Sequence, residues 1–125
     1  MEKILLVEDD KNAQELYKEI LTSAGYSVDT ASDGEEGLNK IMDGGYALIF
    51  LDIMLPKMDG LSILSALSEG EAPKKPNGKI VVLSNLTHDP VITEAMSLGA
   101  FGHISKPSFN PEEFIEKVKT LLMSK

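Results

Sequence analysis

The chain has 125 residues, and its 20 acidic residues outnumber 12 basic ones, all of them lysine, for a formal net charge of −8. This length suits one domain, and a hydrophobic fraction of 42% supports a packed core and excludes global disorder. The absence of cysteine excludes disulfides and thiolate zinc sites, and the acidity without any arginine argues against direct nucleic-acid binding.

No stretch of the sequence predicts contact with a membrane. The apolar runs, such as Ala47–Leu51 and Ile80–Leu83, are far shorter than the ~20 residues that a membrane span needs. The chain also does not open with a cationic segment followed by an apolar one, which is the pattern of a secretion signal. We therefore expect a cytoplasmic domain.

Short apolar runs alternate with amphipathic segments along the whole chain. The predicted elements, in chain order, are a strand at Ile4–Val7, a helix at Ala13–Ala24, a strand at Ser27–Ala31, a helix from Gly34 to Gly44, a strand at Tyr46–Leu51, a helix at Leu61–Leu67, a strand at Ile80–Leu83, a helix from Pro90 to Gly99, a strand at Phe101–Ile104 and a helix from Pro111 to Leu122. This alternation predicts an α/β domain of parallel βαβ units with right-handed crossovers.

Local signals place the helix ends and their buried faces. Asp89 and Asn110 each stand before a proline, which is typical of an N-cap followed by the first helical residue. The first helix carries an apolar stripe typical of an amphipathic helix with one face on the core, formed by Ala13, Leu16, Tyr17, Ile20, Leu21 and Ala24. Met42 and Met96 fall at helix positions where we expect flexible core filling.

Polar side chains follow four of the predicted strands. Glu8, Asp9 and Asp10 come after the first strand and Asp52 after the third; Ser84 and Lys106 come after the fourth and fifth. Ligands of open parallel sheets bind beyond the carboxyl ends of the strands, so these groups are expected to converge there. Each group alone has a plainer explanation, and Asp10 is expected to be a helix N-cap.

Clustered carboxylates repel one another and need a cation nearby. Lys106 would supply one positive charge, and oxygen donors without cysteine or histidine select Mg²⁺, with Mn²⁺ as an alternative. A carboxylate in such a pocket can attack phosphorus, and phosphoryl transfer then mainly needs charge neutralisation and positioning. Asp52 is the expected nucleophile because it stands centrally, while Ser84 and Lys106 can each hold one phosphoryl oxygen.

The sequence resembles the receiver domains of two-component response regulators over essentially its full length. The resemblance is carried by ILLVEDD (4–10), LIFLDIMLPKMDG (48–60), IVVLS (80–84), the Gly99-Ala100 pair and SKP (105–107). It implies a single receiver domain over residues 1–125. It also implies a doubly wound (βα)5 fold of the flavodoxin and CheY type, with a five-stranded parallel sheet in the order 2-1-3-4-5.

The same resemblance implies roles for the acidic residues. Asp52 would accept a phosphoryl group from a phosphohistidine and would also face the metal. Asp9 would bind Mg²⁺ directly, and Glu8 would act mainly through metal-bound water. A further metal contact would come from the backbone carbonyl of Met54.

Ser84 and Lys106 would form the switch. In the family the hydroxyl at the position of Ser84 moves toward the phosphoryl group, and the lysine at the position of Lys106 pairs with a phosphoryl oxygen. The bond from Lys106 to Pro107 is expected to be cis, which would fix the direction of the lysine. Phosphorylation would thereby change the face formed by the fourth helix, fifth strand and fifth helix.

Two positions depart from the family pattern. His103 stands where tyrosine or phenylalanine is usual; it would swing as that aromatic residue does, add pH sensitivity, or be a solvated imidazole without a switching role. Asn85 stands where alanine or glycine is usual, and its bulk is expected to slow donor access or alter the lifetime of the acyl phosphate. His88, in the same loop, is expected at the surface.

Two other functions share parts of this pattern. A haloacid-dehalogenase-like phosphatase would also use an aspartyl-phosphate intermediate, but it usually has a second acid two residues after the nucleophile, where this chain has Met54. A flavodoxin-like nucleotide binder would need a phosphate-friendly loop after the first strand, and here that loop is acidic. We therefore expect a stoichiometric phosphoacceptor rather than an enzyme.

The expected partners follow from the resemblance. A sensor histidine kinase or phosphotransfer protein would donate the phosphoryl group, and an effector that the sequence does not identify would read the changed surface. The chain would be a monomer or a weak phosphorylation-dependent dimer. Pairing through a network of basic and acidic residues is disfavoured because the chain has no arginine and carries Phe101-Gly102 where such acids are common.

Overall fold

A computed structural model describes residues 2–53, 55, 57–70, 72–84, 90–105 and 110–123, with Ser84 and Ser105 entering by their backbone alone. Within these residues, five strands alternate with five helices: β1 (Lys3–Val7), α1 (Lys11–Ser23), β2 (Ser27–Ala31), α2 (Gly34–Asp43), β3 (Leu48–Asp52), α3 (Gly60–Glu69), β4 (Lys79–Ser84), α4 (Pro90–Ser97), β5 (Gly102–Ser105) and α5 (Pro111–Met123). The predicted α/β alternation is confirmed.

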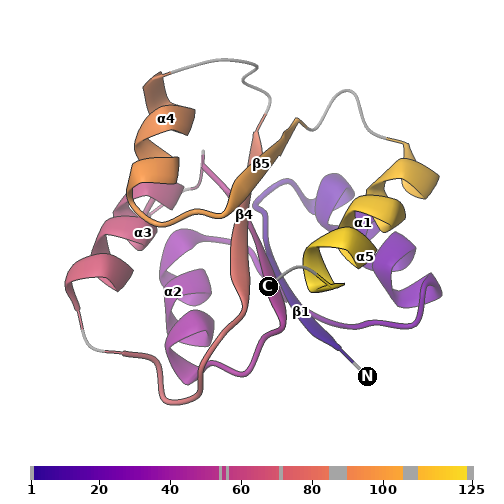
Figure 1. Cartoon of the computed structure of the whole chain (residues 1–125), viewed down its shortest axis with the longest axis horizontal. Coiled ribbons are helices and arrows are strands. Elements are labelled where there is room, and N and C mark those ends of the chain that lie inside the picture. The colour runs from indigo at the N-terminus through magenta and orange to yellow at the C-terminus, as the bar shows by residue number, and fades with distance from the viewer. Residues whose placement is uncertain are drawn as a thin grey trace.

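The strands form one parallel sheet in the order β2-β1-β3-β4-β5, which also confirms the predicted topology. Helices α1 and α5 cover one face of this sheet, and α2, α3 and α4 cover the other (Figure 1). Each face has its own apolar core, because the central strands bury side chains on both sides. Residues Leu48–Asp52 of β3 are buried throughout, as expected for a strand covered by two helical layers.

Capping side chains fix where four helices begin. Asp10 accepts hydrogen bonds from the first turn of α1 at 2.9 and 3.2 Å, as expected for an N-cap. Asp33, Asp59 and Asn110 do the same for α2, α3 and α5, at 2.8, 2.8 and 2.9 Å. Asp89, the predicted cap of α4, lies outside the described residues.

Strand β3 lies further along the chain than predicted. The prediction was Tyr46–Leu51, but the backbone N–H of Tyr46 donates to the Asn77 side chain (3.1 Å) and the strand begins at Leu48. At its other end the strand includes Asp52, which pairs with Leu83 of β4. Asp52 is therefore the last residue of β3 rather than the first residue after it.

The fifth strand and the first helix are also displaced by one or two residues. Strand β5 starts after Phe101 and ends at Ser105, which pairs with Ser84. Helix α1 starts at Lys11 because Asp10 caps it, and Ala24 is its C-cap residue.

Two apolar residues that were predicted to be buried are exposed. Leu16 is 51% and Met96 is 42% exposed, whereas Met42 is half-buried. The predictions for Leu16 and Met96 were wrong because only a narrow stripe of each helix faces the sheet: α1 buries Tyr17 and Leu21, and α4 buries a similar short stripe. No helix in the described part of the chain is long and apolar enough to cross a membrane.

Candidate functional site

The register of the central strands brings three carboxylates together at the carboxyl edge of the sheet. Val7 of β1 pairs with Leu51 of β3, so the residues that follow them lie side by side. One carboxylate oxygen from each of Glu8, Asp9 and Asp52 lies within 4.8 Å of the other two. The structure therefore brings together the three acidic residues that the sequence singled out.

Burial makes this cluster unfavourable without a counter-charge. Glu8 is fully buried and Asp52 is 5% exposed, whereas Asp9 is exposed to solvent. Like charges at this separation repel, and burial removes the water that would screen them. The donor set consists of carboxylate oxygens, which suits a hard divalent cation such as Mg²⁺. The residues present therefore fit the metal that the sequence predicted.

Backbone and side-chain hydrogen bonds hold the first acidic residue in place. The Glu8 N–H donates to the Ala31 carbonyl (3.0 Å), and the Asp10 N–H donates to the Glu8 carboxylate (3.1 Å). The Gln14 side-chain amide donates to the Glu8 carbonyl at 2.9 Å and also reaches the Ala31 carbonyl and the Ser32 hydroxyl, each at 3.3 Å. Gln14 thus fastens the acidic loop to the end of β2.

Sequence reasoning did not single out Gln14. It lies in the first turn of α1, six residues after Glu8, where a polar residue is ordinarily taken as solvent-exposed. In the structure it is half-buried against the turn that follows β1. Nothing in the spacing of the acidic residues points to it, because its partners are mainly backbone oxygens.

Several predicted site residues lie outside what the structure describes. They are Met54, Asn85, His88, Lys106, Pro107 and the side chain of Ser84. The predicted cis bond between Lys106 and Pro107 falls there as well. The backbone of Ser84 lies one residue beyond Leu83, the partner of Asp52, and pairs with Ser105.

His103 is half-buried on β5, in register with Val82. It lines a cavity of about 290 Å³ that also involves Phe101 and residues of α5 such as Lys117. The three predicted alternatives for His103 stay predictions, and His103 is not a member of the carboxylate cluster.

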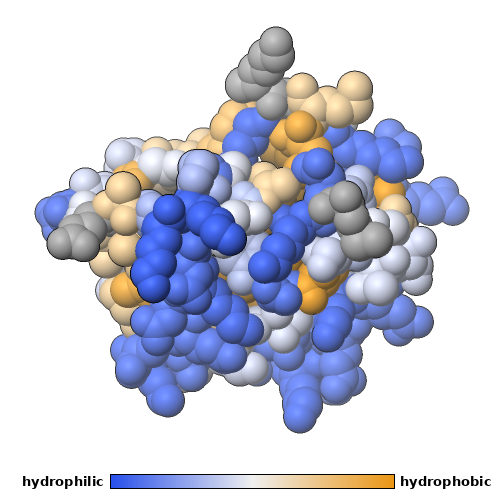
Figure 2. All heavy atoms as spheres, turned by 90° about the horizontal axis from the view of Figure 1, so that it is seen from below, coloured by the Kyte–Doolittle hydropathy of each residue, from blue (hydrophilic) through white to orange (hydrophobic). Residues whose placement is uncertain are grey.

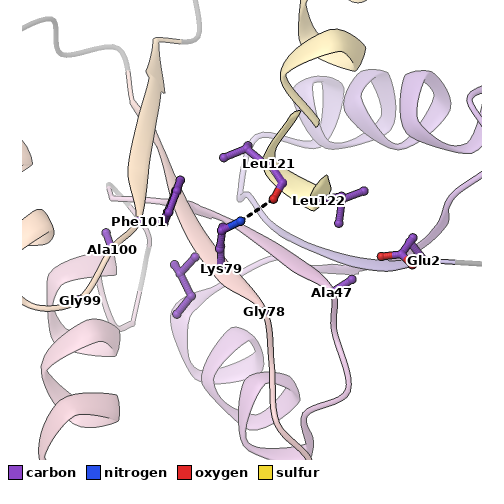
Figure 3. Close-up of a pocket in the computed structure, with 10 residues that line it drawn as sticks. Glu2, Ala47, Gly78, Lys79, Gly99, Ala100, Phe101, Leu121 and Leu122 are labelled. Carbon is purple, nitrogen blue, oxygen red and sulfur yellow. Dashed lines mark hydrogen bonds between the residues drawn. The ribbon is translucent and has the colours of Figure 1, made fainter. Parts of the chain in front are cut away.

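A second cavity lies at the opposite, amino-terminal end of the strands. It measures about 640 Å³, and residues from β4, from the segment before β5 and from α5 line it (Figure 3). The Lys79 ammonium donates to the Leu121 carbonyl (2.7 Å) and lies 4.7 Å from the centre of the Phe101 ring. The face seen from below Figure 1 is mostly hydrophilic, with apolar residues in separate patches (Figure 2). Among the described residues that line the cavity around Lys79, Glu2 is the one acidic residue.

The comparisons with known proteins agree with the geometry. The family model described as "Response regulator receiver domain" matches residues 4–119. The chain belongs to the response regulator receiver domain family. It is 35% identical over 123 residues to the chemotaxis protein CheY of Treponema pallidum, covering 96% of this chain and 82% of that protein. Receiver domains are signalling proteins of two-component systems that interact with histidine kinases.

Other relatives are longer proteins. The receiver domain is 40% identical over 121 residues to the transcriptional regulatory protein DltR of Streptococcus agalactiae, covering 94% of this chain and 50% of that one. The chain thus spans about half the length of these curated transcriptional regulators.

Solved structures show the same fold. The Francisella response regulator 1452 receiver domain matches with a TM-score of 0.84 and 30% identity over 98% of this chain and 97% of that one. The regulator TrrA of Thermotoga maritima, solved in complex with Mg²⁺ and BeF, matches with a TM-score of 0.79 and 37% identity over 97% and 99% of the two chains.

Proposed function

We propose that residues 1–125 form a single cytoplasmic receiver domain that works as a phosphoacceptor switch, with Asp52 as the acceptor. The observation that carries the proposal is the cluster of Glu8, Asp9 and Asp52, two of them buried, at the carboxyl edge of the sheet. The donor would be the phosphohistidine of a sensor histidine kinase or phosphotransfer protein. The chain would remain a monomer or a weak dimer.

In the proposed reaction a carboxylate oxygen of Asp52 attacks the phosphorus atom. The new O–P bond forms as the P–N bond of the phosphohistidine breaks, and the departing imidazole nitrogen keeps the bonding electron pair and takes a proton. Asp52 suits this role because it ends the central strand β3, where it pairs with Leu83 of β4, while Glu8 and Asp9 supply the remaining carboxylates. Mg²⁺, held by these residues and by the Met54 carbonyl, would neutralise the transferred oxygens.

Ser84 and Lys106 would couple phosphorylation to a change of surface. Their side chains would turn toward the phosphoryl group, and the loop after β4 and the face of α4, β5 and α5 would follow. An effector protein would read this face. The chemistry would be stoichiometric, with slow self-phosphorylation from small donors and slow self-dephosphorylation.

The direct test is intact-mass measurement after incubation with acetyl phosphate or phosphoramidate and Mg²⁺. We expect the mass of one phosphoryl group to be added, and we expect the addition to require the metal. Asp52→Asn should abolish it, and Asp9→Asn should reduce it strongly. Asp43→Asn is the matched control, because Asp43 is an exposed acid at the far end of α2.

Three outcomes would overturn the proposal. The first is a phosphoryl group that persists in Asp52→Asn, and the second is a reaction that proceeds equally in EDTA. The third is turnover of a generic phosphomonoester at ~1 s⁻¹ or faster, which would indicate a phosphatase instead. The coupling is tested separately by NMR. Binding of a phosphoryl analogue should shift the amide signals of α4 and α5 in the wild type, but should leave them unchanged in Ser84→Ala and Lys106→Ala.

A further inference from the structure

Helix α2 is packed by its backbone between the two segments that carry the acidic cluster. A Cβ atom added to Gly37 would lie 2.8 Å from a methyl group of Val7, the residue before Glu8. A Cβ atom added to Gly34 would overlap the carbonyl oxygen of Met58, in the loop that follows Asp52. The first turn of α2 therefore sets the separation between the end of β1 and this loop.

The first residue of α3 lies directly against the end of β3. The Gly60 N–H donates to the Ile53 carbonyl at 2.8 Å, and a Cβ on Gly60 would lie 2.8 Å from the Asp52 carbonyl oxygen. A displacement of the loop near Met58 is therefore transmitted to the backbone of Asp52 and Ile53.

One residue of this loop has a backbone conformation that its side-chain type disfavours. Lys57 has φ 68°, in the left-handed region, where glycine is the usual residue. Its ammonium lies 3.6 Å from a carboxylate oxygen of Asp33, the N-cap of α2. Because glycine would suit the backbone better, the presence of lysine needs another reason, and the ion pair supplies one.

The two carboxylate oxygens of Asp33 have different partners. One oxygen accepts the Glu36 N–H at 2.8 Å and caps α2, and the other faces Lys57. The pKa of Asp33 is lowered, chiefly by the hydrogen bond from the Glu36 N–H; burial opposes this effect, and the charge of Lys57 adds to it.

We propose that Lys57 and Asp33 are positioning residues for the metal site: their ion pair fastens the described residues before α3 to α2, and so sets the position of Asp52 relative to Glu8 and Asp9. This inference rests on the proposed function, because Asp52 is the proposed acceptor and a member of the acidic cluster that would hold the metal. Neither residue belongs to the carboxylate cluster itself.

The same helix carries a matched control. Lys74 and Asp43 form an ion pair of 3.8 Å at the carboxyl end of α2, away from the acidic cluster. The control joins the same helix to the loop before β4 with the same two residue types. If the variants act only by removing a charge or by loosening α2, breaking either pair should weaken Mg²⁺ binding. If the pair positions the site, only variants of Lys57 and Asp33 should weaken it.

The experiment measures Mn²⁺ binding by loss of the free-ion EPR signal, with Mg²⁺ as competitor, together with the urea midpoint. Lys57→Met and Asp33→Asn should each weaken Mg²⁺ binding about twofold to fivefold, the range of a partly exposed ion pair. Asparagine keeps the N-cap of α2. The double variant should be no weaker than the single ones, and Lys57→Arg should bind as the wild type does.

The direction of the change in Mg²⁺ affinity separates a positioning role from other effects. A purely long-range field predicts tighter Mg²⁺ binding in Lys57→Met and weaker binding in Asp33→Asn, whereas positioning weakens both. Lys57→Gly relieves the left-handed backbone, so its urea midpoint should rise while its Mg²⁺ affinity falls. A merely structural role would move these two quantities in the same direction.

The outcomes distinguish this inference from the proposed function. If the wild type binds no divalent ion, both fail. If the wild type binds Mg²⁺ and Asp9→Asn does not, but Lys57→Met and Asp33→Asn bind as the wild type does, only the positioning role is wrong. Equal weakening in Asp43→Asn and Lys74→Met would also overturn it.

Discussion

Removing one charge from the acidic cluster should stabilise the metal-free protein. In Asp9→Asn the two buried carboxylates of Glu8 and Asp52 lose a like-charged neighbour within 4.8 Å. At that separation two unit charges repel by about 3.5 kcal/mol at an effective dielectric constant of about 20, and by about 0.9 kcal/mol in water. Because Asp9 is exposed, screening favours the lower end. We expect a gain of about 1 kcal/mol in unfolding free energy.

Urea unfolding with and without Mg²⁺ measures this effect. In EDTA, Asp9→Asn should unfold at a higher urea concentration than the wild type with an unchanged m-value. Added Mg²⁺ should raise the wild-type midpoint, because an ion that binds the folded state stabilises it, and should raise that of Asp9→Asn much less. Glu19→Gln, which removes an exposed acid from α1, is the control for net charge and should change neither result.

Two results would contradict the repulsion between these carboxylates. If Asp9→Asn is no more stable than the wild type in EDTA at neutral pH, or if Mg²⁺ raises both midpoints equally, the three carboxylates do not form the repulsive cluster that the geometry implies.

The remaining predictions concern the surroundings of the site and the core. Gln14→Leu should lower the unfolding free energy by about 0.5 to 1.5 kcal/mol, because two partly buried backbone oxygens lose a donor; a urea midpoint equal to that of the wild type would contradict this. Burial alone would raise the pKa of Asp29, but the hydrogen bond from Tyr46 and the charge of Lys3 together lower it below 3.8. The ionised Asp29 therefore stabilises the folded state above pH 3.8, and this stabilisation is lost as the pH falls through the lowered pKa. Tyr46→Phe should therefore lose less unfolding free energy than the wild type when the pH falls below 3.8. If the two proteins lose the same amount, the Tyr46–Asp29 hydrogen bond does not contribute to this pH dependence. Phe114→Ala should cost about 3 to 5 kcal/mol in thermal or urea unfolding, because the ring is 1% exposed and packs 5.2 Å from the Phe50 ring; a loss under about 1 kcal/mol would mean that the core collapses to fill the space.

The carboxyl edge of the sheet could be predicted from the sequence because the local pattern of apolar runs and the parallel topology lead to the same arrangement. A short unbroken apolar run such as Leu48–Leu51 is typical of a strand covered on both faces, and parallel strands present their carboxyl ends at the same edge of the sheet. The juxtaposition of Glu8, Asp9 and Asp52 follows from that topology without any knowledge of side-chain packing. Helix starts were equally local, since Asp33 and Asp59 cap the helices that they precede.

Burial within a helix was less predictable, because periodicity identifies a stripe but not its width. Leu16 belongs to the apolar stripe of α1, yet Tyr17 and Leu21 occupy the line that meets the sheet. Met96 is exposed for the same reason on α4. The covered width of a helix depends on which neighbours flank it, and that is a property of the assembled layers rather than of the helix.

The contacts that hold the acidic residues were invisible in the sequence for a different reason. Gln14 acts mainly through backbone oxygens, which every residue has, and Lys57 pairs with a residue on another element. Gly34 illustrates the difficulty best. After an aspartate it is typical of a helix start, and that interpretation is correct, but its lack of a Cβ is also what lets the carbonyl of Met58 approach. Gly34 thus meets two requirements, a helix start and close contact with another segment. The sequence pattern around it reveals only the helix start.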